Sequence, residues 1–121
     1  MRVLLADEQS RVRSALRILL EQNSDYDIVG EATEAVELVE KVQRDAIELV
    51  VLDWRLPGLD GEVLIEELRK TVQNPMIVVL SGRPEARQTA LEAGADAFIS
   101  KAAPPDELLA ALHEVCGKHL L

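Results

Sequence analysis

Three carboxylates directly follow apolar runs in the first half of the chain. Asp7 and Glu8 follow Val3–Ala6, and Asp53 follows Leu49–Leu52. Carboxylates that lie close together repel one another and favour a bound cation, and oxygen ligands favour a hard ion such as Mg²⁺. A carboxylate can also attack a phosphoryl group to form an acyl phosphate. The spacing therefore predicts phosphoryl transfer, with Asp7 and Glu8 as metal ligands and the isolated acid, Asp53, as nucleophile and further ligand.

Two other polar residues follow apolar runs in the second half of the chain. Ser81 comes directly after Met76–Leu80, and Lys101 comes shortly after Ala97–Ile99. The transition state of phosphoryl transfer is loose and spreads its charge over the phosphoryl oxygens, so positioning and positive charge supply most of the catalysis. We expect Lys101 to supply a cation and Ser81 a hydroxyl donor to the same reaction.

These polar residues fit one architecture, in which short apolar runs alternate with helical patterns. The predicted strands are Val3–Ala6, Asp27–Glu31, Leu49–Asp53, Met76–Leu80 and Ala97–Ile99. Strict alternation favours an α/β fold, a parallel sheet with helices on both faces and right-handed crossovers. Five strands suit the flavodoxin-like order 2-1-3-4-5, whose ligand crevice lies between the ends of the first and third strands. The acids would border that crevice, and Ser81 and Lys101 would lie on the same rim.

Local signals predict where the helices begin and which side chains they bury. Thr33 is expected to cap the second helix and Asp60 the third, after a type II turn at Pro57-Gly58. Pro84 suits the first turn of a fourth helix that runs to about Gly94. The second helix has the apolar stripe Val36, Leu38, Val39 and Val42, and the third helix carries Val63, Leu64, Ile65 and Leu68. The buried face of the fourth helix offers little more than Ala86, Ala90, Leu91 and Ala93. The fourth helix, held mainly by alanines, should be the easiest to displace.

Composition limits the class of function. The chain has 121 residues, 48% of them hydrophobic, which suits one domain over residues 1–121. Its 13 basic and 22 acidic residues give a net charge of −9, which disfavours direct binding to nucleic acid or to an anionic membrane. No apolar run approaches the roughly 18 residues of a membrane helix, and the chain starts with strand-like sequence instead of a signal peptide. We therefore expect a cytoplasmic protein.

Four segments of the sequence resemble one known family. They are Ala6-Asp7-Glu8, the stretch from Val51 to Gly61, Val79-Leu80-Ser81-Gly82, and the stretch from Gly94 to Lys101. Together they resemble the CheY-like receiver domain of two-component response regulators, over the whole chain. The endings Ala97–Lys101 and Pro105–Leu109 are most similar to receivers of the NarL/LuxR class.

The resemblance implies a phosphorylation switch. It implies that a histidine kinase or a phosphotransfer protein phosphorylates Asp53, and that the backbone carbonyl of Arg55 joins Asp7 or Glu8 and Asp53 in binding Mg²⁺. It also implies that Ser81 and Phe98 act as switch residues that change the surface of the fourth helix, the fifth strand and the last helix. Chemistry beyond self-catalysed phosphotransfer and autodephosphorylation is not expected.

Partners are implied in the same way. Receivers of the NarL/LuxR class usually carry a C-terminal helix-turn-helix domain that binds DNA, and none is present in this chain. A phosphorylation-dependent homodimer is a further expectation.

Two other functions compete with the switch. One is a pseudo-receiver, a protein-binding module that phosphorylation does not regulate, although all the charged site residues are retained. The other is a phosphatase similar to the haloacid dehalogenases, which also form an aspartyl phosphate. That family has a second Asp two residues after its nucleophile, and this chain has Arg55 there.

Overall fold

Five parallel strands form one sheet in the order β2-β1-β3-β4-β5 in a computed structural model, which describes the backbone of residues 1–120 and the side chains of residues 1–117. The strands are β1 (Arg2–Ala6), β2 (Asp27–Ala32), β3 (Leu49–Asp53), β4 (Met76–Ser81) and β5 (Ala97–Ser100). The predicted α/β, flavodoxin-like fold and its strand order are therefore confirmed.

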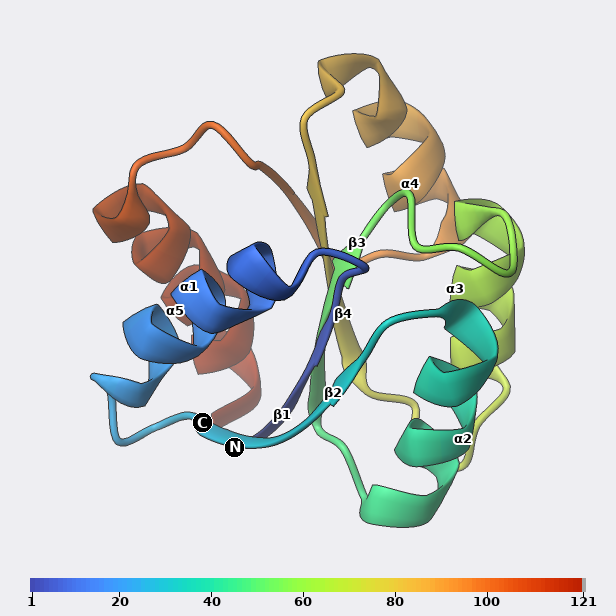
Figure 1. Cartoon of the computed structure of the whole chain (residues 1–121), viewed down its shortest axis with the longest axis horizontal. Helices are drawn as coiled ribbons and strands as arrows, with labels where there is room; N and C mark the ends of the chain where they lie inside the picture. The colour runs from blue at the N-terminus through green and yellow to red at the C-terminus, as the bar shows by residue number, and fades with distance from the viewer. Residues whose placement is uncertain (121) are drawn as a thin grey trace.

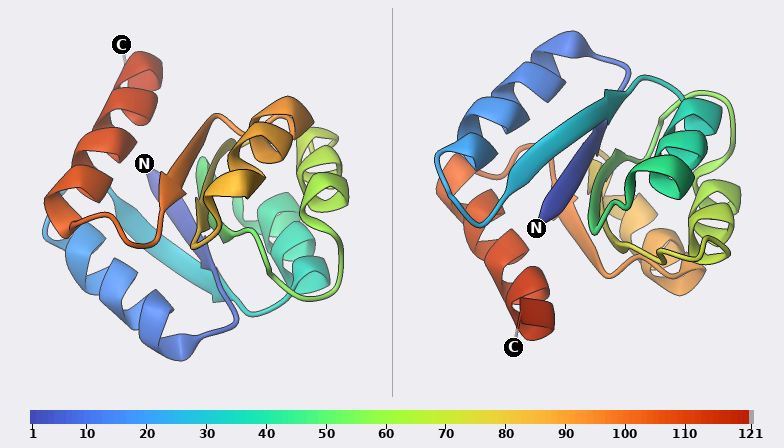
Figure 2. Two further views of the ribbon diagram at one scale, coloured as in Figure 1. Left: turned by 90° about the horizontal axis from the view of Figure 1, so that it is seen from above. Right: turned by 90° about the horizontal axis from the view of Figure 1, so that it is seen from below.

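Helices cover both faces of this sheet (Figure 1). They are α1 (Ser10–Glu21), α2 (Ala35–Asp45), α3 (Gly61–Arg69), the 3₁₀ turn η1 (Pro84–Ala86), α4 (Arg87–Ala93) and α5 (Pro105–Leu120). Both views of Figure 2 show α1 and α5 on one face and α2, α3 and α4 on the other. Within residues 1–120, no helix combines the length and the apolar character that crossing a membrane requires.

Each face of the sheet has its own hydrophobic core. Along β1, Val3 and Leu5 pack beneath α1 and α5, whereas Leu4 and Ala6 pack beneath α2 and α3. This alternation follows from the two-residue period of a strand. All six residues of the more central β4 are buried, as its continuous apolar run predicts. The polar strand β2 lies at an edge, as its sequence indicates.

The start of α2 differs from the prediction. Glu34, and not Thr33, occupies the N-cap position, and its carboxylate accepts hydrogen bonds from the backbone N–H groups of Val36 at 3.2 Å and Glu37 at 2.6 Å. The carboxylate of Glu37 reaches back to the backbone N–H of Thr33 at 2.7 Å. Glu34 and Glu37 therefore cap the N-terminus of α2, a role that Ser, Thr, Asp or Asn usually fills. At α3, Asp60 is the N-cap residue as predicted, but its side chain makes no capping hydrogen bond.

The apolar stripes are narrower than predicted. Val36 and Leu91 are 52% and 36% exposed, so their expected burial is wrong, and Val63 on α3 is 41% exposed. Each lies on its helix beside the stripe that faces the sheet. The predicted helix from Pro84 to Gly94 begins instead as η1 and becomes α-helical at Arg87.

The loop between β3 and α3 is fixed by two glycines. Gly58 has a φ of 110°, the left-handed value that its predicted place in a type II turn requires. Gly61 leaves room for the indole ring of Trp54, because a Cβ atom at Gly61 would lie 2.6 Å from the nearest ring atom. Trp54 is therefore held against the start of α3, immediately after Asp53.

We predict that Gly61→Ala destabilises the protein by about 1–3 kcal/mol, the usual cost of overpacking, because the added methyl group displaces the Trp54 ring. Urea denaturation followed by circular dichroism measures this change, and Trp54 fluorescence reports the displaced ring. Gly30→Ala is the matched control, because a Cβ atom there meets only Leu4 at an ordinary 3.9 Å. Equal stabilities of the two variants would contradict the packing role of Gly61.

Candidate active site

A lysine ammonium joins two carboxylates at the carboxyl ends of the strands. Nζ of Lys101 lies 3.0 Å from Oδ2 of Asp7 and 3.3 Å from Oδ1 of Asp53. Asp7 follows β1, Asp53 ends β3 and Lys101 follows β5. Three of the residues singled out from the sequence therefore meet at one edge of the sheet, although they lie far apart in the chain.

Burial shapes the charges of this cluster. The side chain of Asp7 is 2% exposed and that of Asp53 is 12% exposed. Burial raises the pKa of Asp53, the negative charge of Asp7 raises it further, and the Lys101 ammonium only partly opposes both effects. Burial alone would lower the pKa of Lys101, but its hydrogen bond to Asp7 and the charge of Asp53 outweigh burial and raise it. The two acids thus favour a nearby cation.

Tight turns orient the two acids. The backbone N–H of Gln9 donates to Oδ1 of Asp7 at 2.9 Å, and the backbone N–H of Arg55 donates to Oδ1 of Asp53 at 3.3 Å. Each carboxylate is thus held by the residue two positions later, the Asx-turn geometry that Asp favours. Both side chains point into the cluster because their own loops fix them there.

Ser81 ends β4, and Phe98 lies on the neighbouring strand β5, where it pairs with Val79. Ser81 is 3% exposed, and its hydroxyl oxygen accepts a hydrogen bond from the backbone N–H of Arg83 at 3.0 Å. Its carbonyl oxygen accepts from the backbone N–H of Lys101 at 3.0 Å, which ties the start of the Lys101 loop to β4. Phe98 is half-buried on β5 and packs against the core beneath α2, α3 and α4. Ser81 therefore lies at the predicted rim.

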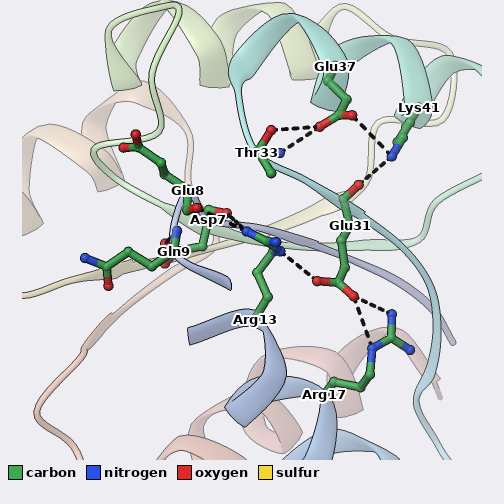
Figure 3. A network of polar contacts seen from close by, with 9 residues as sticks. All are labelled: Asp7, Glu8, Gln9, Arg13, Arg17, Glu31, Thr33, Glu37 and Lys41. Carbon is green, nitrogen blue, oxygen red and sulfur yellow. Dashed lines mark hydrogen bonds and ion pairs between the residues drawn. The ribbon is translucent and has the colours of Figure 1, made fainter. Parts of the chain in front are cut away.

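The remaining predicted metal ligands are more open. The side chain of Glu8 is exposed, and Figure 3 shows its carboxylate directed away from the side chain of Arg13. Arg55 is exposed as well. Among the residues whose side chains are described, no three His, Cys, Asp or Glu side chains converge as a ready metal cluster. Lys101 instead occupies the position between Asp7 and Asp53.

This donor set nevertheless fits a hard cation. The two converging carboxylates supply only oxygen ligands, and the burial of Asp53 leaves its negative charge incompletely balanced. Mg²⁺ usually keeps several waters and needs only one or two carboxylates from the protein. Asp7 and Asp53 could therefore hold Mg²⁺ without a third carboxylate.

A group of charged residues that the sequence did not indicate lies beside Asp7. Arg13 and Arg17 on α1 both bind the carboxylate of Glu31 on β2, and Lys41 on α2 donates to the backbone carbonyl oxygen of Glu31 (Figure 3). In the sequence these residues look like ordinary solvated charges. The four-residue spacing of Arg13 and Arg17 is the single available signal, because it puts both on one face of a helix.

The raised pKa of Asp53 predicts that Asp53→Asn stabilises the fold at neutral pH in Mg²⁺-free buffer. Because the folded-state pKa lies above the unfolded value, the ionised carboxylate weakens folding above both values. This penalty, and with it the advantage of Asp53→Asn, should shrink as the pH falls through the folded-state pKa.

Urea denaturation over a pH series measures this difference. Asp45→Asn is the control, because a surface hydrogen bond from Arg44 lowers the pKa of Asp45, so this substitution should bring no gain at neutral pH. A variant Asp53→Asn that is less stable than the wild type at neutral pH would contradict the account of this charge.

Comparison with known proteins places this fold and site in a family. The family model described as the response regulator receiver domain matches residues 3–113. The nitrate/nitrite response regulator protein NarL of Escherichia coli K12 is 32% identical over 98% of this chain and 56% of its own length. The chain spans about half the length of the curated relatives it matches.

Solved structures agree with this match. A two-component response regulator of the LuxR family from Aurantimonas sp. SI85-9A1 superposes with a TM-score of 0.86 at 29% identity, over 96% of this chain and 85% of that one. RcsB from Salmonella enterica serovar Typhimurium, bound to promoter rprA in the presence of phosphomimetic BeF3−, gives a TM-score of 0.87 at 25% identity, over 95% and 59% of the two chains. This chain belongs to the response regulator receiver domain family, and its relatives are of the NarL/LuxR class.

Proposed function

We propose that this chain is a phosphorylation-controlled signalling switch that accepts a phosphoryl group on Asp53 from a histidine kinase or a phosphotransfer protein. The observation that carries the proposal is the Lys101 ammonium between Asp7 and Asp53 at the carboxyl ends of the strands. Membership of the receiver family supports it, because receivers are the partners of histidine kinases.

In the proposed reaction an oxygen of the Asp53 carboxylate attacks phosphorus. A bond forms between that oxygen and phosphorus, the bond between phosphorus and the donor nitrogen breaks, and the electron pair leaves with the donor imidazole. Lys101 offsets the charge of the phosphoryl oxygens, and Ser81 donates a hydrogen bond to one of them once its hydroxyl turns toward Asp53. Asp7 and Asp53, with Glu8 and the carbonyl of Arg55, would hold Mg²⁺, which supplies further positive charge when bound.

The proposed signal travels from Ser81 to Phe98 and α4. Phosphorylation adds about −1.5 to −2 charges at Asp53, which attracts the Ser81 hydroxyl and the Lys101 ammonium. Movement of Ser81 vacates space that Phe98 on the neighbouring strand can fill. Apart from Ala86 and Ala90, η1 and α4 bury little of their own surface, so this segment is easily displaced. The output surface is therefore α4, β5 and α5.

The output itself is proposed from the relatives. The curated relatives are about twice as long as this chain, and RcsB, a structural neighbour, binds promoter rprA. By likeness to these proteins we propose that this chain works with a DNA-binding domain, in a cytoplasmic protein that forms a phosphorylation-dependent homodimer. The net charge of −9 argues that the receiver does not touch nucleic acid itself. A pseudo-receiver that binds partners without phosphorylation is the alternative, and the phosphorylation assay below separates the two.

Asp53→Asn should abolish stable phosphorylation, because the amide cannot attack phosphorus. Incubation with acetyl phosphate and Mg²⁺, followed by intact-mass measurement, should show one added phosphoryl group on the wild type and none on the variant. Asp60→Asn is the matched control, because Asp60 lies on the loop that follows and its carboxylate makes no capping hydrogen bond.

One phosphoryl group on Asp53→Asn would disprove the assignment of the nucleophile. A wild type that gains none, while it binds Mg²⁺, would favour the pseudo-receiver.

Ser81→Ala should permit phosphorylation of Asp53 but weaken the response of α4, β5 and α5. A charge-assisted hydrogen bond from Ser81 contributes about 1.5–3 kcal/mol. Shifting the equilibrium between two conformations from 1:99 to 99:1 requires about 5.5 kcal/mol. Phe98→Ala should uncouple the same response. Amide chemical-shift changes on addition of beryllofluoride and Mg²⁺ measure this response.

Ser100→Ala is the control for the switch, since Ser100 pairs with Ser81 across the sheet but is exposed. Full-sized shift changes over α4, β5 and α5 in both Ser81→Ala and Phe98→Ala would rule out this route.

A further inference from the structure

A guanidinium group of α1 holds the turn that carries Asp7 and Glu8 (Figure 3). Nη1 of Arg13 donates to the backbone carbonyl oxygen of Asp7 at 2.8 Å and to that of Glu8 at 3.2 Å. The Arg13 side chain is only 15% exposed, and its contact with the Asp7 carbonyl is partly buried, whereas its contact with the Glu8 carbonyl is open to water. Within residues 1–117, no backbone N–H outside the regular helices and strands donates to either carbonyl.

Other contacts fix the rest of Asp7. Its backbone N–H donates to the carbonyl oxygen of Ala32 on β2 at 3.1 Å, and its carboxylate is held by Gln9 and Lys101. The carbonyl side of the turn is the part that strand pairing leaves unrestrained. Arg13 supplies the missing restraint there, and it does so for Glu8 as well.

Glu31 orients this guanidinium. Its Oε1 accepts from Nε of Arg13 at 2.7 Å, and its Oε2 accepts from Nη2 of Arg17 at 2.8 Å. Burial disfavours the charged form of Glu31, yet the hydrogen bonds from Arg17 and Arg13 outweigh burial and lower its pKa. Glu31 therefore stays ionised and keeps Arg13 turned toward the Asp7–Glu8 turn.

Charge and geometry predict opposite effects of Arg13 on a metal ion. As a cation near the carboxylates, Arg13 repels Mg²⁺, so charge alone predicts that its removal tightens metal binding. As a restraint on the turn, Arg13 keeps the ligands in place, and such supporting contacts typically strengthen metal binding 10- to 100-fold. Arg13 contacts the carbonyl oxygens of two consecutive residues, Asp7 and Glu8, and a counter-ion would not need such contacts. We therefore expect positioning to outweigh charge repulsion, so that Arg13 strengthens Mg²⁺ binding.

We propose that Arg13, oriented by Glu31, is a positioning residue that fixes the Asp7–Glu8 turn in the conformation that holds Mg²⁺ beside Asp53. This inference rests on the proposed function, since it concerns the same metal site. It assigns a role in that site to Arg13 on α1 and Glu31 on β2, the edge strand farthest from β5, which carries Phe98.

A Mg²⁺ titration of the full chain tests the proposal. Trp54 is the single tryptophan and follows Asp53, so its fluorescence should report metal binding. Arg13→Met should weaken Mg²⁺ affinity about 10-fold, at the low end of the range for supporting contacts. Arg17→Met is the matched control, because it removes an equal charge from the same Glu31 but no contact with the turn. It should leave the affinity unchanged or slightly tighter.

Two further variants separate positioning from stability. Arg13→Lys keeps the charge but cannot span both carbonyls and Glu31, so its Mg²⁺ affinity should lie between those of the wild type and Arg13→Met. Glu31→Gln keeps both arginines and should weaken affinity less than Arg13→Met. Thermal unfolding of each variant without metal shows that the titrations are done on folded protein. If Arg13→Met does not fold, Arg13→Lys decides the question.

Unchanged or tighter Mg²⁺ binding by Arg13→Met and Arg13→Lys would overturn the proposal, and so would an equal loss in Arg17→Met. Asp53→Asn separates this failure from failure of the proposed function. If the wild type and Asp53→Asn bind Mg²⁺ equally well, or neither binds it, the metal site itself is wrong and both proposals fall. If Asp53→Asn weakens binding but the Arg13 variants do not, only the role of Arg13 is wrong.

Discussion

The attraction between one lysine ammonium and two poorly solvated carboxylates links three strands at one edge of the sheet. Lys101 lies within hydrogen-bond or ion-pair distance of Asp7 and Asp53, two like-charged carboxylates at the ends of the neighbouring strands β1 and β3. Burial, and then the negative charge of Asp7, raise the pKa of Asp53 despite the opposing effect of the Lys101 ammonium. A further cation would reduce the remaining repulsion between the two carboxylates, which is why we propose that the site binds a metal ion.

The rest of the fold keeps this unfavourable arrangement in place. The apolar strands β1, β3 and β4 are paired along most of their length, so their carboxyl ends have little freedom. Short loops then hold the acids, through the N–H of Gln9 for Asp7 and the N–H of Arg55 for Asp53. Arg13 and Glu31 add a side-chain restraint from α1 and β2. The paired strands thus hold these like charges close together at the edge of the sheet despite their mutual repulsion.

Much of this could be predicted from the sequence because the signals are local. Apolar runs that end in Asp53, Ser81 or the segment before Lys101 mark strand ends, and the parallel fold brings such ends together. The cap of α2 could not be assigned in this way, since Thr33 and Glu34 are neighbours and only the backbone decides which one caps. The role of Arg13 was missed because it depends on Glu31, a partner 18 residues away. Whether Val36 and Leu91 are exposed depends on how each helix is rotated about its axis relative to the sheet. The presence of an apolar residue does not determine this rotation.

A crystal structure with Mg²⁺ and beryllofluoride would test the central claim most directly, namely that the Lys101 cluster is one site for a metal ion and a phosphoryl group on Asp53. The account predicts a beryllofluoride adduct on the Asp53 carboxylate, Mg²⁺ bound by Asp7 and Asp53, and Lys101 moved from between the two acids to contact the fluoride. A structure in which Asp53 carries no adduct at saturating beryllofluoride, with Lys101 still between Asp7 and Asp53, would contradict it.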